Sequence, residues 1–69
     1  MSLTGRHILV SGAARGLGTV ISRHLAEAGA RLTLVDILEE EGRAVAAELS
    51  AEFHRVDLRD PASVAALGT

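Results

Sequence analysis

Three glycines follow a short apolar run near the N-terminus, in the segment "VSGAARGLGTV" of residues 10–20. Gly12, Gly16 and Gly18 have the spacing G-x-x-x-G-x-G, whereas a simple turn needs only one or two glycines. Glycines at this spacing let a ligand come close to the backbone, and the N–H groups of Gly16, Leu17 and Gly18 would face its negative charge. The loop therefore predicts a site for the pyrophosphate of a dinucleotide.

Each glycine has its own expected task in such a loop. Gly12 permits a tight turn off a strand, Gly16 leaves room for the pyrophosphate, and Gly18 lets the start of a helix pack closely on that strand. The competing interpretation is a flexible turn without a ligand.

A carboxylate, Asp36, ends the next apolar run, "RLTLVD", 18 residues after Gly18. At that place it can accept hydrogen bonds from both hydroxyls of an adenosine ribose and would repel a 2′-phosphate, which favours NAD over NADP. Arg15 argues for NADP, because a guanidinium beside the loop could meet a 2′-phosphate. A basic side chain at residue 37 could bind that phosphate as well, but residue 37 is Ile. The alternative for Asp36 is a carboxylate that only starts a turn.

The hydrophobic pattern predicts strands and helices in alternation. The residues of the first helix that recur at helical spacing and should face the core are Leu17, Val20, Ile21, Leu25 and Ala28. Those expected on the other side are Thr19, Ser22, Arg23 and Glu27. The predicted strands cover residues 8–10, 31–36 and 52–58, and the predicted helices cover residues 17–28 and 38–49, with a third helix beginning at Asp60 and Pro61.

The order β-α-β-α-β predicts an α/β fold with a parallel sheet, because right-handed crossovers return each strand beside the one before it. The expected strand order is 3-2-1, which is the first half of a Rossmann-type doubly wound sheet. Residues 1–69 are thus expected to form the N-terminal part of a single NAD-binding domain.

The segments "SGAARGLG", "LVD" and "VDL" together resemble the N-terminal part of a short-chain dehydrogenase/reductase, over essentially all 69 residues. The loop pattern of that family is T-G-x-x-x-G-x-G, and Ser11 here replaces the Thr while keeping its hydroxyl. The resemblance implies that Asp57, paired with Leu58, contacts the adenine amino group; the alternative is a carboxylate that only caps the strand end. The predicted cofactor-binding residues are Ser11, Gly12, Arg15, Gly16, Leu17, Gly18, Asp36, Asp57 and Leu58.

The resemblance also implies hydride transfer between a nicotinamide ring and an alcohol or carbonyl substrate. The family performs it with a Tyr-x-x-x-Lys pair, a Ser and an Asn beyond the third strand, and this chain contains no Tyr, Lys or Asn. We therefore assign no catalytic residue and predict the cofactor-binding half of an NAD-dependent oxidoreductase. The alternatives are a stand-alone, non-catalytic NAD- or adenosine-binding module and an inactive truncated fragment. Made alone, residues 1–69 should be inactive and self-associated or poorly folded.

Composition excludes several other functions. The net charge of −2 shows no basic excess for nucleic acid or a membrane surface, and the absence of Cys excludes disulfides and thiolate metal sites. The three histidines lie on different predicted elements, without the spacing of metal ligands. We expect a cytoplasmic protein that is a homo-oligomer when complete.

Overall fold

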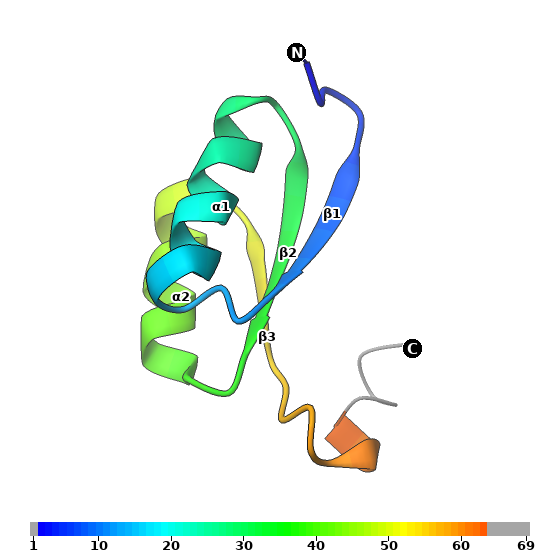
Figure 1. Ribbon diagram of the computed structural model, residues 1–69, viewed down its shortest axis with the longest axis vertical. Helices are drawn as coiled ribbons and strands as arrows, with labels where there is room; N and C mark the ends of the chain where they lie inside the picture. The colour runs from blue at the N-terminus through cyan, green and yellow to red at the C-terminus, as the bar shows by residue number, and fades with distance from the viewer. Residues whose placement is uncertain (1, 64–69) are drawn as a thin grey trace.

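The computed structural model describes residues 2–63 and contains three strands and two helices (Figure 1). Their order confirms the predicted alternation of strand and helix. In chain order they are β1 (His7–Ser11), α1 (Gly16–Glu27), β2 (Arg31–Asp36), α2 (Glu39–Leu49) and β3 (Glu52–Arg55).

The three strands form one parallel sheet in the order β1-β2-β3, which is the predicted 3-2-1 order read from the opposite edge. Ser11 pairs with Val35, and Asp36 pairs with Arg55. Because all strands run the same way, their carboxyl ends share one edge of the sheet. The glycine loop, the β2–α2 turn and the segment after β3 all leave the sheet at that edge.

Both helices cover the same face of the sheet (Figure 1). The core between the helices and the sheet contains Val10, Leu32 and Leu34 from the strands and Val45 and Ala46 from α2. Leu34, on the central strand, is completely buried. Leu9 points to the other face and is 52% exposed, so within residues 2–63 β1 is buried on one face only. The short apolar run of residues 8–10 would suit a strand buried on both faces, which these residues do not show.

The inward face of α1 agrees with the prediction at Leu25, which packs against the core, and differs from it over residues 17–22. Thr19 and Ser22 are buried against the sheet, whereas Leu17, Val20 and Ile21 are exposed. The two buried hydroxyls donate hydrogen bonds to backbone carbonyls, Thr19 Oγ1 to Ala13 at 2.8 Å and Ser22 Oγ to Gly18 at 2.8 Å. Small side chains whose polar groups are satisfied in this way let the helix lie close to the sheet without a burial penalty.

The inward face of α2 contains Gly42, Val45 and Ala46, which are buried. Gly42 has a packing reason to be Gly: a Cβ atom there would collide with the ring of Phe53 on β3. The close contact between α2 and the sheet thus accounts for a residue of low helix propensity inside the helix.

The predicted start of a third helix is confirmed as far as the structure describes it. Asp60 caps it, because its Oδ1 accepts a hydrogen bond from the N–H of Ala62 at 3.0 Å, and residues 61–63 are helical. The rest of that predicted helix lies outside the described residues.

Candidate cofactor-binding site

The glycine loop joins the end of β1 to the start of α1 at the carboxyl edge of the sheet. Gly12 and Gly16 have φ values of +68° and +59°, in the left-handed region that favours Gly. A Cβ atom on Gly18 would collide with the carbonyl oxygen of Gly12, so the helix can only begin this close to β1 with Gly at that position. A Cβ atom on Gly16 would meet no protein atom within 4 Å, so this part of the loop faces open space.

The first turn of α1 carries no group that would compete with an anion. Its N-cap residue, Arg15, makes no side-chain capping hydrogen bond, and no acidic residue lies in the first turn. The first turn of α2 contains Glu39, Glu40 and Glu41 instead. A helix N-terminus has free N–H groups and a positive partial charge. At α2 the carboxylates of the first turn already meet that charge, whereas at α1 the N-terminus can hold an anion from a ligand.

Asp36 ends β2 and reaches toward the glycine loop. Its Oδ2 accepts a hydrogen bond from the N–H of Ala14 at 3.0 Å, and its Oδ1 accepts one from the N–H of Leu38 at 3.0 Å. A carboxylate offers about four acceptor positions, two on each oxygen. Each oxygen of Asp36 therefore keeps one position for a further donor, which suits a pair of neighbouring hydroxyls.

A cleft of about 410 Å³ opens between the ends of the three strands. That volume is in the range of small-molecule and cofactor sites. The cleft brings together five of the nine predicted site residues and leaves Arg15, Gly16, Leu17 and Gly18 outside its lining, on the adjoining loop. Its lining consists of Ser11, Gly12, Val35, Asp36, Ile37, Val56, Asp57, Leu58 and Arg59.

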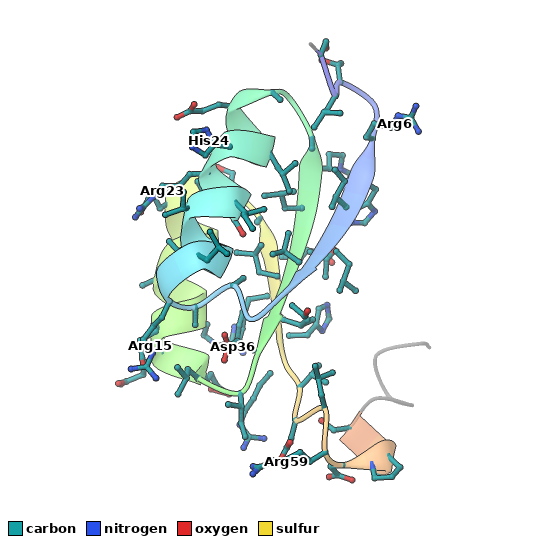
Figure 2. The ribbon with its side chains drawn as sticks, viewed as in Figure 1. Arg6, Arg15, Arg23, His24, Asp36 and Arg59 are labelled. Atoms are coloured by element: carbon teal, nitrogen blue, oxygen red, sulfur yellow. The ribbon has the colours of Figure 1, made fainter. Side chains whose placement is uncertain are left out.

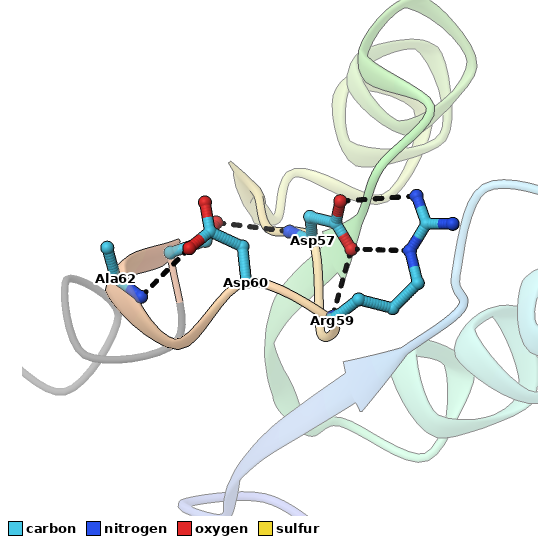
Figure 3. Close-up of polar contacts among 5 residues, drawn as sticks. Asp57, Arg59, Asp60 and Ala62 are labelled. Atoms are coloured by element: carbon cyan, nitrogen blue, oxygen red, sulfur yellow. Dashed lines mark hydrogen bonds and ion pairs between the residues drawn. The ribbon is translucent and has the colours of Figure 1, made fainter.

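Asp57 lies in the cleft with a cationic partner, Arg59. The Arg59 guanidinium donates to both carboxylate oxygens, from Nε to Oδ1 at 3.1 Å and from Nη2 to Oδ2 at 3.2 Å (Figure 3). These bonds, a bond from the backbone N–H of Arg59 and the positive charge of Arg55 lower the pKa of Asp57 below its ordinary value. The same contact raises the pKa of Arg59. Asp57 is therefore an ionised acceptor at neutral pH.

Arg15 and Asp36 lie at the same end of the molecule as Arg59 (Figure 2). The sequence interpretation included Arg15 and noted Ile37, but it missed Arg59 as part of the cleft. The spacing Asp-x-Arg in "VDLRD" could have indicated this contact. In a tight turn, the side chain of Arg59 can fold back to the carboxylate of Asp57, two residues before it.

The remaining titratable groups form no second centre in the part of the chain that the structure describes. Within residues 2–63, no group of three or more His, Cys, Asp or Glu side chains could hold a metal ion. His7 lies across the sheet from the core, with Nε2 2.7 Å from Thr33 Oγ1. Neither helix in these residues has the length and apolar character needed to cross a membrane.

A parallel sheet with a closely packed glycine loop at its carboxyl edge places the chain among the Rossmann-type α/β folds. The particular family follows from the sequence of that fold. The chain belongs to the short-chain dehydrogenase family, whose model matches residues 6–68. This match confirms the family resemblance.

Two curated relatives and one solved structure illustrate the similarity. A 3-alpha-(or 20-beta)-hydroxysteroid dehydrogenase of Mycobacterium tuberculosis is 47% identical over 62 residues, which cover 87% of this chain and 24% of that protein. Trans-4-hydroxycyclohexanecarboxylate dehydrogenase of Sinomonas cyclohexanicum is 48% identical over 54 residues, covering 78% and 21%. A metagenomic short-chain oxidoreductase in complex with NADP has a TM-score of 0.89 and 39% identity, covering 97% and 33%. The chain thus spans about a quarter of the length of these curated relatives.

Proposed function

We propose that this chain supplies the adenosine- and pyrophosphate-binding part of an NAD-dependent oxidoreductase acting on an alcohol or carbonyl substrate. The observation that carries the proposal is the Asp36 carboxylate, fixed between the glycine loop and α2 with one acceptor position left on each oxygen. The two free positions match the 2′- and 3′-hydroxyls of a ribose. Family membership supports a nicotinamide cofactor, and both curated relatives described above are named as dehydrogenases.

Different residues of the site fit different parts of such a cofactor. The open side of Gly16 and the free N–H groups at the start of α1 would hold the pyrophosphate. Asp36 would hold the adenosine ribose, with Ser11 and Gly12 lining the same side of the cleft. Asp57 and Leu58 would hold the adenine. When bound, the nicotinamide ring of the cofactor would accept or donate the hydride.

NADP is the competing cofactor. Arg15 adjoins the loop, and the metagenomic relative was solved with NADP. Against NADP, its 2′-phosphate would replace the ribose hydroxyl that could donate a hydrogen bond to Asp36. The negative charges of the phosphate and the Asp36 carboxylate would then repel each other. Ile37, which lines the cleft, adds no positive charge. These features favour NAD.

A non-catalytic binding module is the second candidate, because the residues assigned to the site bind the cofactor and none is assigned to catalysis. A turnover assay with secondary alcohols separates the two candidates, since both bind the cofactor and only the oxidoreductase reduces it. Cytoplasmic location and homo-oligomer assembly stay predictions.

Calorimetric titration of the intact protein carrying this sequence tests the cofactor proposal. We expect saturable binding of NADH and binding of NADPH that is weaker by about tenfold or more, the equivalent of one lost charged contact. Equal affinity for the two dinucleotides would contradict the role of Asp36, and absence of binding would contradict the proposed function.

A further inference from the structure

The carboxylate of Asp57 is held by three donors from one residue. Arg59 donates from its backbone N–H to Oδ1 at 2.9 Å, from Nε to Oδ1 at 3.1 Å and from Nη2 to Oδ2 at 3.2 Å (Figure 3). The side-chain bonds are bidentate, so they fix the plane of the carboxylate as well as its position.

This contact leaves Asp57 with little remaining capacity. Of about four acceptor positions on a carboxylate, Arg59 occupies both on Oδ1 and one on Oδ2. Counting donors among residues 2–63, one position is left, on Oδ2. Asp57 and Arg59 both line the cleft, and the side chain of Asp57 is 25% exposed, so its carboxylate is accessible to a ligand there.

We propose that Arg59 is a positioning residue for base recognition, which holds Asp57 so that its one free acceptor selects a purine with an exocyclic amino group. The inference rests on the proposed function, in which the adenine ring occupies this end of the cleft. An adenine amino group would donate to Oδ2. A hypoxanthine ring has a carbonyl oxygen at the same place, and this oxygen would face the carboxylate without a donor between them.

The backbone around Asp57 has its own supports, so the Arg59 side chain acts on the carboxylate and not on the path of the chain. The N–H of Asp57 donates to Ser63 Oγ at 3.1 Å, and the N–H of Asp60 donates to the Asp57 carbonyl at 2.9 Å. The Arg59 side chain itself is 85% exposed. An ion pair this exposed contributes little to the stability of a fold, which leaves orientation as its main effect.

Binding of two dinucleotides to the intact protein tests the inference. The probes are NADH and the reduced nicotinamide hypoxanthine dinucleotide, which differ only in the purine. We expect the unsubstituted protein to prefer NADH by about tenfold, because one charge-assisted hydrogen bond distinguishes the two purines. Arg59→Ala should remove most of that preference, and Arg59→Lys should keep part of it, since an ammonium can hold one carboxylate oxygen but not both.

Arg43→Ala is the matched control. Arg43 is an exposed Arg on α2 that lies 3.7 Å from Glu39 in an ion pair and does not line the cleft, so its removal changes the net charge equally. The base preference should stay as in the unsubstituted protein. If Arg59→Ala and Arg59→Lys bind both dinucleotides with the original preference, or if Arg43→Ala loses it equally, the inference is wrong and the proposed function stands. If the unsubstituted protein binds neither dinucleotide, both are wrong.

Discussion

The carboxylate of Asp36 accepts a hydrogen bond from the backbone N–H of Ala14 at 3.0 Å and so joins the end of β2 to the glycine loop. The same carboxylate holds the start of the next turn through the N–H of Leu38. Asp36 therefore fixes the loop before any ligand arrives, and the two interpretations of this residue, turn former and ribose acceptor, are compatible. The bonds that form the turn leave free the acceptor positions that a ribose would need.

Asp36→Ser is expected to shift cofactor preference from NAD toward NADP. The substitution removes the repulsion of a 2′-phosphate and the acceptors for the ribose hydroxyls, and each charged hydrogen bond contributes about 1.5–3 kcal/mol at most. The ratio of kcat/KM for NAD and NADP, measured on the intact enzyme, should fall by about tenfold or more. Loss of the bond from Ala14 weakens the loop for both cofactors, so the ratio isolates the effect on the ribose. An unchanged ratio would refute the assignment of Asp36.

Gly16→Ala is expected to weaken dinucleotide binding through both strain and obstruction. Its φ of +59° costs an L-residue about 1 kcal/mol, and its Cβ would enter the open space where the pyrophosphate is proposed to lie. Gly5→Ala is the matched control, because Gly5 has a φ of +86° and equally open surroundings away from the cleft. Both variants should lose similar stability in thermal unfolding, and only Gly16→Ala should lose affinity in calorimetric titration. Equal affinities would return Gly16 to the role of a turn residue.

Gly42→Ala is expected to destabilise the fold, although Ala is the better helix former by about 1 kcal/mol. The added methyl group would collide with the Phe53 ring, and such overpacking costs about 1–3 kcal/mol. Denaturant unfolding of the intact protein should show a lower midpoint for Gly42→Ala. The double variant Gly42→Ala with Phe53→Leu should recover part of the loss. A more stable Gly42→Ala protein would show that the contact between α2 and β3 is loose.

The sequence predicted the elements well because their boundaries carry chemical signals. The three loop glycines Gly12, Gly16 and Gly18, the strand-ending Asp36 and the Asp60–Pro61 cap each mark a junction, and the structure places them at junctions. Over residues 17–22, the inward face of α1 was predicted wrongly because hydrophobicity alone was used. Thr19 and Ser22 can be buried once their hydroxyls bond to carbonyls of the same segment, and a periodicity of apolar residues cannot show this.

The candidate site was predictable to the extent that its residues lie at the ends of parallel strands. Because the strands run in the same direction, one cleft is lined by residues at or just after their carboxyl ends, namely Ser11, Asp36 and Asp57. The Asp-x-Arg spacing made a contact between Asp57 and Arg59 possible, but the contact forms only because the turn lets the Arg59 side chain return to Asp57. The hydrogen bond between Asp36 and Ala14 depends equally on the path of the folded loop.

The polypeptide of residues 1–69, made alone, is expected to be inactive and to self-associate or fold poorly. Among the described residues, β1 pairs with β2 on one side only, and Leu9, Leu17, Val20 and Ile21 are exposed. An unpaired strand edge with apolar neighbours is a template for pairing with another chain. Sedimentation and circular dichroism should show large species or an uncooperative melt, and Leu9→Lys should reduce the association. A monomer with a cooperative melt and NAD affinity would favour the stand-alone binding module.

The most direct test of the central claim is to locate the cofactor on the intact protein by NMR, from the changes in amide chemical shifts during titration with NADH. The account predicts that the largest shifts fall on Gly12, Ala14, Gly16, Leu58 and Arg59, at the carboxyl edge of the sheet. Amides at the opposite edge, such as those of Arg31 and Ser50, should move little. Shifts concentrated at that opposite edge, or no shifts at saturating NADH, would contradict the claim that this cleft holds the dinucleotide.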